Sequence, residues 1–185
     1  TQKFDLIEQY AGQIPNKLIA LGNHDVRKND SSSSTGFSSN YAVAYEAYMR
    51  DNKKYRDDPD SDKVYFDKWI NGYHFIVLNT EDGLKDCIDM SEEQLVWFEQ
   101  KLGEGENGAA GAADPEKPVF VAVHQALNDT HPRANAYGGF TKEEELMNRV
   151  REILSGYPQA VVMSGHIHNG FGIATTMDKT YGTMI

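Results

Sequence analysis

The stretch PVFVAVHQ, Pro118–Gln125, contains a continuous apolar run, Val119 to Val123, that ends at His124. A short run of this kind, with no polar residue in it, is typical of a β-strand that is buried on both faces. Similar runs occur in YHFIVLNT at Tyr73–Thr80 and in AVVMS at Ala160–Ser164, and a shorter one, LIAL, at Leu18–Leu21. These four segments predict a sheet with a largely apolar interior.

Amphipathic helices are predicted between these strands. Two of them begin with capping boxes, Ser91 with Gln94 and Thr141 with Glu144. Apolar or aromatic residues recur at helical spacing in four segments: Phe4, Ile7 and Ala11; Tyr41, Tyr45 and Tyr48; Leu95, Phe98 and Leu102; Leu146, Val150, Ile153 and Leu154. We expect the tyrosines to pack rather than to line a pocket. Alternating strands and helices indicate an α/β layered domain with both faces of its sheet covered.

The length and composition limit the kinds of protein that this chain could be. The 185 residues fit a single domain, 1–185, with a polar surface excursion at 28–62 and a Gly/Ala-rich linker loop at 103–117. Asp and Glu outnumber Lys and Arg by 28 to 18, and the net charge of −10 argues against a protein that coats nucleic acid. No apolar run approaches the roughly 20 residues of a membrane span. The single cysteine, Cys87, cannot form an intrachain disulfide, and we expect it to be an apolar packing residue.

Three of the four predicted strands stop at residues that can bind metal. LIAL leads into Gly22-Asn23-His24-Asp25, VFVAV leads into His124, and AVVMS leads into SGHIHNG, with His166 and His168. In open α/β sheets, ligands gather beyond the carboxyl ends of the strands. If these strands are neighbours, their side chains converge on one site.

The residue types suit a transition-metal centre. Imidazole and amide oxygen are ligands for Zn, Mn or Fe. On an extended backbone, residues two positions apart point the same way, so His166 and His168 could each serve one cation of a pair. Gly22 and Gly165 permit a close approach of the backbone in front of the ligands. The pattern favours a two-metal hydrolytic centre.

GNHD, a later isolated His and GHIH together resemble the calcineurin-like metallophosphoesterase family. The pattern of that family is D-x-H, G-D, G-N-H-D/E, H and G-H-x-H, and the last three blocks occur here in order, at Gly22–Asp25, His124 and Gly165–His168. The resemblance implies a four-layer α/β/β/α sandwich with two mixed sheets and two metal ions at the strand ends.

The resemblance also implies roles for individual residues. Asn23, His124 and His166 would hold one metal ion and His168 the other. His24 would act on the leaving oxygen, and a metal-bound hydroxide would attack the phosphorus of a phosphomonoester or phosphodiester. Asp25 is expected to hold the metal ligands in position without contacting the metal ion itself. The cofactors would be two divalent or mixed-valence ions of Mn, Fe or Zn, and the substrate a small phosphoester or a phosphoprotein.

One departure from the family pattern concerns the carboxylates. Neither D-x-H nor G-D stands ahead of GNHD, where the family has them. We therefore expect a fragment whose fold is incomplete at the N-terminus and also, since the sequence ends soon after GHIH, at the C-terminus. The four remaining ligands are neutral, which predicts partial metal occupancy and negligible turnover for this chain.

Residues beside these motifs are candidates for substrate contacts. Arg133 could bind phosphoryl oxygens with its planar guanidinium, and Asn169 adjoins GHIH. His131 is expected to be structural or exposed, and His74, inside a strand, is left out of the site.

Two other functions fit the same residues. A non-catalytic scaffold would keep the fold and bind a protein through its surface. A one-metal binding module would use Asn23, His124 and His166 and take up metal without phosphatase activity. The substrate, the native metal, the compartment and the oligomeric state are left open by the sequence.

Overall fold

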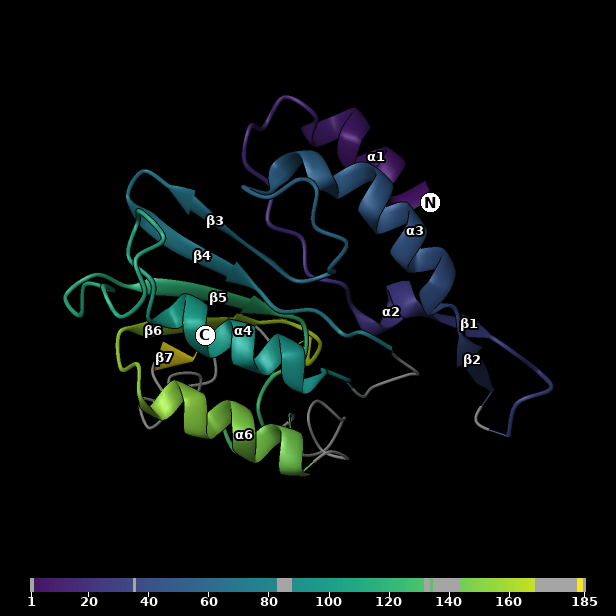
Figure 1. Ribbon diagram of the computed structural model, residues 1–185. Coiled ribbons are helices and arrows are strands. Elements are labelled where there is room, and N and C mark those ends of the chain that lie inside the picture. Colours follow the sequence, from purple (N-terminus) through teal and green to yellow (C-terminus); the bar gives the residue numbers. More distant parts are fainter. Residues whose placement is uncertain are drawn as a thin grey trace.

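A computed structural model describes residues 2–34, 36–82, 88–131, 134, 144–168 and 183–184. Its centre is a mixed five-stranded sheet in the order β3-β4-β5-β6-β7 (Figure 1). The strands are β3 Phe66–Ile70, β4 Tyr73–Val77, β5 Val119–Val123, β6 Ala160–Ser164 and β7 Thr183–Met184. β3 runs antiparallel to β4, and the other neighbouring pairs are parallel. The carboxyl ends of β4, β5 and β6 therefore meet at one edge of the sheet.

Three of the predicted strands are confirmed. The structure places β4, β5 and β6 side by side, with Val121 of β5 opposite both Ile76 and Val162. Alternate residues of β5 point into the core, since Val119, Val121 and Val123 are buried. This register brings the segment after β5 next to the segment after β6.

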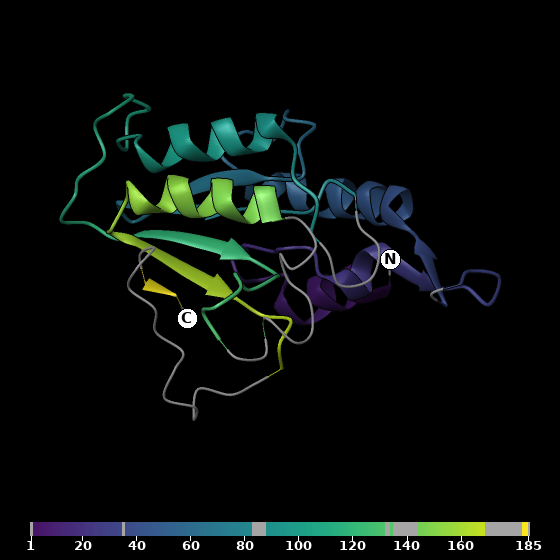
Figure 2. The ribbon, with the colours of Figure 1, turned by 90° about the horizontal axis from the view of Figure 1, so that it is seen from below.

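Helices α4, Glu92–Leu102, and α6, Glu144–Ser155, lie side by side on one face of the sheet (Figure 2). The predicted cap of α4 is confirmed, because the Ser91 side chain accepts a hydrogen bond from the Gln94 backbone N–H. Leu95, Phe98 and Leu102 of α4 are buried. They share one core with residues of α6, among them Val150, Ile153 and Leu154. The Thr141 cap lies outside the described residues.

A second core joins α1, Gln2–Ala11, and α3, Tyr41–Asn52, to the antiparallel edge of the sheet. Phe4 packs edge-on against Tyr48, with ring centroids 6.0 Å apart, and Tyr48 is fully buried. The tyrosines of α3 therefore pack, as expected. Between α1 and α3 lie the short helix α2, Asn23–Val26, and the hairpin β1 Arg27–Asn29 and β2 Phe37–Ser39, while the 3₁₀-helix η1, Lys53–Tyr55, follows α3.

The segment 18–21 is not a strand, contrary to the prediction. β3 and β5 occupy both edges of β4, and in the described part of the chain this segment pairs with no strand. Side chains hold its backbone instead. The Tyr48 hydroxyl donates to the Ile19 carbonyl at 2.7 Å, and the Leu21 N–H donates to Asn79 Oδ1 at 2.5 Å.

Strand β3 was not predicted. It pairs with β4 through a turn at Asn71 and Gly72, which both have positive φ, 53° and 78°. Two residues with positive φ form the type I′ turn that matches the twist of a hairpin. The turn explains why a segment as polar as FDKWI becomes an edge strand.

The α/β class predicted from the sequence is confirmed, but the described residues form one mixed sheet and a two-stranded hairpin rather than two mixed sheets. Coverage of the sheet is also uneven. The face under α4 and α6 is buried, whereas on the other face Phe75 and Phe120 are only half-buried and stack on each other, with centroids 4.9 Å apart. Within the ranges that the structure describes, no helix is long and apolar enough to cross a membrane.

Candidate functional site

Three segments far apart in the sequence meet at the carboxyl edge of the sheet: the α2 loop, the residue after β5 and the turn after β6. Figure 1 shows α2 beyond this edge. His124 Nε2 is 3.1 Å from Asn23 Oδ1. The rings of His124 and His166 are 5.2 Å apart between centroids and stand edge to face at 73°. The structure thus brings together Asn23, His124 and His166, three of the four predicted ligands.

Gly22 allows this approach. A Cβ atom at Gly22 would lie 2.8 Å from Cε1 of His124 and 3.0 Å from both ring nitrogens, closer than real Cβ contacts. The Gly22 N–H also donates to Asp25 Oδ2 at 2.9 Å, which closes the first turn of α2. The missing side chain therefore leaves the room that the His124 ring occupies.

The backbone after β6 turns rather than continuing as a strand. β6 ends at Ser164, the Gly165 N–H donates to the His124 carbonyl at 3.0 Å, and the Ile167 N–H donates to the Gly165 carbonyl at 2.7 Å. His166 and His168 both have positive φ, 66° and 52°. The extended geometry assumed for this histidine pair is therefore wrong. Positive φ at two non-glycine residues is strained, and such strain concentrates at functional sites.

Burial sets the charge state of His124. It lowers the pKa of this imidazole to about 4, and the electrostatic influence of the neighbouring His166 adds to the effect. His124 is therefore neutral at pH 7 and presents a lone pair, which is the form of imidazole that binds a metal ion. Asn23, with 3% of its surface exposed, adds a neutral amide oxygen.

His24 lies at the border of this cluster. Its ring is exposed, and Arg27 Nη2 lies 3.1 Å from His24 Nε2. Partial burial, the charges of Arg27 and Lys3, and the electrostatic influence of His168 lower the pKa of His24. His24 is therefore within electrostatic reach of His168 and of the cations Lys3 and Arg27.

The Asp25 carboxylate holds the loop through hydrogen bonds. It accepts from the Gly22 N–H and from Lys3 Nζ, the latter at 2.7 Å. Lys3 Nζ also donates to the His24 carbonyl at 3.2 Å. These contacts suit the supporting role that the resemblance implies for Asp25.

The side chains that meet here could supply part of the ligand set of a metal centre. Asn23, His124 and His166 offer an amide oxygen and two imidazoles, which suit Zn, Mn or Fe. Among the residues that the structure describes, no three His, Cys, Asp or Glu side chains form a group that could hold a metal ion. The donors present are thus neutral, and the carboxylates that usually neutralise a pair of divalent cations are not among them.

Other predicted positions lie apart from the cluster or outside the described residues. Arg133 and Asn169 are among the latter, as is Cys87. The tripeptide Asp129-Thr130-His131 has the spelling D-x-H, but it follows His124 in the chain, whereas the family places its D-x-H block first. Asp129 pairs with Arg151 at 3.3 Å, and His131 is 5% exposed, which agrees with a structural role for this histidine.

Sequence reasoning missed Lys3 and Arg27. Both line a cavity that has His24 in its wall. The spacing of Arg27, three residues after His24, was a signal that could have been used, because residues three apart share one side of a helical turn. Lys3 gave no such signal, since only the packing of α1 against the α2 loop brings it near.

Comparison with known families gives one match. Residues 2–170 match the family described as Calcineurin-like phosphoesterase, which covers all of the described site. No curated protein gives a significant match to this chain.

Proposed function

Because this chain belongs to the calcineurin-like phosphoesterases, we propose that it is the catalytic domain of a hydrolase of phosphomonoesters or phosphodiesters with a dinuclear metal site. The family suggests a metal-dependent phosphoesterase. The number of metal ions, the ligands and the type of ester are part of the proposal.

One observation carries the proposal. Asn23, His124 and His166 come from three separate segments, and the contacts between Asn23 and His124 and between His124 and His166 join them at the carboxyl edge of a mostly parallel sheet. These three residues would hold one metal ion, and His168 would contribute to the second. When bound, such cations neutralise phosphoryl oxygens and activate water for attack on phosphorus.

The chain itself positions the substrate and supplies a hydrogen-bond donor for the leaving oxygen. The His24 backbone is fixed by Lys3, so the exposed ring is held at the border between the imidazole cluster and the adjoining cavity. We assign to His24 a hydrogen bond to the leaving oxygen, which stabilises the charge that develops there as the ester bond breaks. Gly22 and Asp25 hold the loop that presents Asn23 and His24.

The test is a hydrolysis assay of the whole gene product with Mn²⁺, using 4-nitrophenyl phosphate and bis(4-nitrophenyl) phosphate. We expect His166→Ala to abolish turnover while the circular dichroism and melting temperature stay close to wild type. Asp60→Asn, an exposed carboxylate in a distant loop, is the control. Full turnover in His166→Ala would refute the assignment. The 185-residue chain alone is expected to show negligible turnover, because its donors are neutral.

A one-metal binding module is the second candidate. The observation in its favour is that the three joined residues, Asn23, His124 and His166, are one ligand set, whereas His168 is exposed. Such a module would bind one metal ion with no hydrolysis of either aryl ester by the whole gene product. Metal stoichiometry and turnover, measured on the same sample, separate the two candidates.

A further inference from the structure

The β1–β2 hairpin follows α2 directly and begins the polar excursion at 28–62. Its base is closed by the Asn40 N–H, which donates to the carbonyl of the buried Val26 at 2.8 Å. In the register of the two strands, Arg27 and Phe37 are diagonal neighbours on one face of the hairpin. The hairpin therefore holds a guanidinium and an aromatic ring together, directly after the α2 loop.

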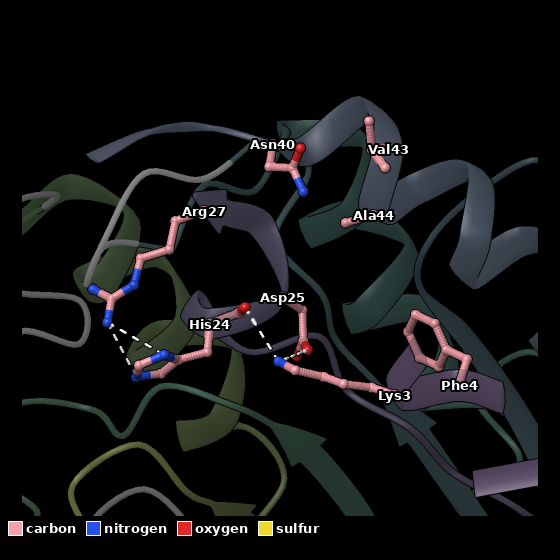
Figure 3. A pocket seen from close by; sticks show the side chains of 8 residues that line it. All are labelled: Lys3, Phe4, His24, Asp25, Arg27, Asn40, Val43 and Ala44. Atoms are coloured by element: carbon pink, nitrogen blue, oxygen red, sulfur yellow. Dashed lines mark hydrogen bonds and ion pairs between the residues drawn. The ribbon is translucent and has the colours of Figure 1, made fainter. Parts of the chain in front are cut away.

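Three flat groups follow one another here, the rings of Phe37 and His24 with the guanidinium of Arg27 between them. The guanidinium carbon lies 4.4 Å from the centre of the Phe37 ring. Arg27 Nη2 lies 3.1 Å from His24 Nε2 and 3.4 Å from His24 Nδ1, and Figure 3 marks both contacts. An atom this close to both ring nitrogens lies over the face of the ring, because an approach in the ring plane would collide with the carbon between them. We call these groups the Phe37–Arg27–His24 stack.

A contact on the face of an imidazole restrains the ring and leaves its edge available. The ring nitrogens donate and accept hydrogen bonds in the ring plane, so the edge of His24 can still reach a leaving oxygen. The His24 ring is exposed, and exposed side chains change rotamer in picoseconds to nanoseconds unless a contact holds them. Lys3 fixes the backbone of His24 through its carbonyl, at 3.2 Å. The stack thus fixes the ring, and Lys3 fixes the backbone that carries it.

We propose that Arg27 is a positioning residue, which is held by Phe37 and holds the His24 ring with its edge toward the leaving oxygen. The proposal rests on the proposed phosphoesterase function and on the role assigned there to His24. The planar surface of the guanidinium supplies this support, whatever other group pairs with its charge. Orientation of this kind matters because misplacing a catalytic group by about 1 Å can cost on the order of 10²-fold in rate.

The first test compares two leaving groups in the Mn²⁺-supplemented whole gene product. Phenol leaves with more difficulty than 4-nitrophenol, so hydrolysis of a phenyl ester depends more on the His24 hydrogen bond. We expect Arg27→Ala to lower kcat for the phenyl ester by about tenfold or more, and kcat for the matching 4-nitrophenyl ester by clearly less, with KM almost unchanged in both cases. A variant whose fold alone is damaged would lose activity on both esters by the same factor.

The second test needs neither metal nor turnover. Nuclear spin relaxation of the ¹³C-labelled His24 ring reports its order on the picosecond to nanosecond timescale. We expect the order parameter to fall in Arg27→Ala and in Phe37→Leu, which keeps Arg27 but removes the ring beside its guanidinium. Phe37→Tyr keeps that ring and should restore the wild-type value. The matched control is Lys28→Ala, which removes a long cationic side chain from the next, exposed position of β1.

Two results would overturn the proposal. One is a His24 ring whose order is the same in Arg27→Ala, Lys28→Ala and wild type. The other is an equal loss of kcat on the phenyl and the 4-nitrophenyl ester in Arg27→Ala. If wild type hydrolyses neither ester, the proposed phosphoesterase function falls separately, and the relaxation data alone decide whether Arg27 holds the ring. If turnover is found but Arg27→Ala leaves the ring ordered, the phosphoesterase stands and the positioning role falls.

Discussion

His124 Nε2 lies 3.1 Å from Asn23 Oδ1, although 101 positions separate the two residues in the sequence. Two structural causes produce this contact. β5 carries His124 to the carboxyl edge of the sheet, and the α2 loop is fixed against that edge by hydrogen bonds from Tyr48 to Ile19 and from Leu21 to Asn79. The site therefore depends as much on how the loop is anchored as on the donors themselves.

Gly22→Ala is expected to displace the His124 ring, because the new Cβ atom would lie 2.8 Å from Cε1 of that ring. We predict a loss of metal affinity of about tenfold, as for other changes that misplace a ligand without removing it. Calorimetric titration with Mn²⁺ measures the loss. Gly156→Ala is the control, since its Cβ would meet its nearest neighbour at 3.4 Å. Equal affinities for the two variants would show that the ring does not need this space.

Asn79→Leu is expected to destabilise the fold by about 3 kcal/mol, because buried groups lose their partner. Asn79 is 1% exposed and accepts from the Leu21 N–H, while its amide donates to Tyr48 Oη at 3.0 Å and to the Val64 carbonyl at 2.8 Å. Urea denaturation gives the change in free energy of unfolding. Asn29→Ala, at an exposed position of β1, should have almost no effect. The anchoring role would be contradicted if Asn79→Leu lowered the free energy of unfolding by no more than Asn29→Ala does.

Asp67→Asn tests the pH dependence of stability. Burial would raise the pKa of Asp67, but the hydrogen bond with His74 and the charge of Lys101 outweigh it and hold the pKa below the ordinary value of 3.8. The folded state therefore favours the carboxylate, so its contribution is present above pH 3.8 and is lost as the pH falls through the lowered pKa.

We thus expect Asp67→Asn to be less stable than wild type by about 1–3 kcal/mol at pH 7, because the buried His74 loses its charged partner. The difference should shrink between pH 4 and pH 3. Urea denaturation at pH 7, 4 and 3 measures it for both proteins. A difference that is constant over this range would show that the charge of Asp67 does not stabilise the fold.

The sequence predicts most of the central sheet because its strands are short apolar runs and its helices carry caps. β5 was predicted with its observed bounds, and the core of α4 follows from the spacing of Leu95, Phe98 and Leu102. β3 was missed because FDKWI has no apolar run, although the following Asn71-Gly72 pair is a strong local signal for a hairpin. The segment 18–21 has the composition of a strand, but whether an apolar run becomes one depends on a free edge to pair with.

The sequence indicated which residues could lie near one another, but not the backbone geometry that places them. The structure places Asn23 against His124 and His124 against His166, while their role as metal ligands stays a prediction. The positive φ angles of His166 and His168 were not predictable from local sequence, because histidine adopts that conformation only uncommonly. The cavity beside His24 depends on α1, whose Lys3 reaches the loop only through tertiary packing.

The most direct test of the account is a calorimetric titration of Zn²⁺ and Mn²⁺ into the 185-residue chain and its Asn23→Ala, His124→Ala and His166→Ala variants, with Asp60→Asn as control. We predict fewer than two tightly held ions per chain, and an affinity that falls by about tenfold or more in each of the three variants but not in the control. Two tightly held ions in wild type, or an affinity unchanged by all three substitutions, would contradict the site described above.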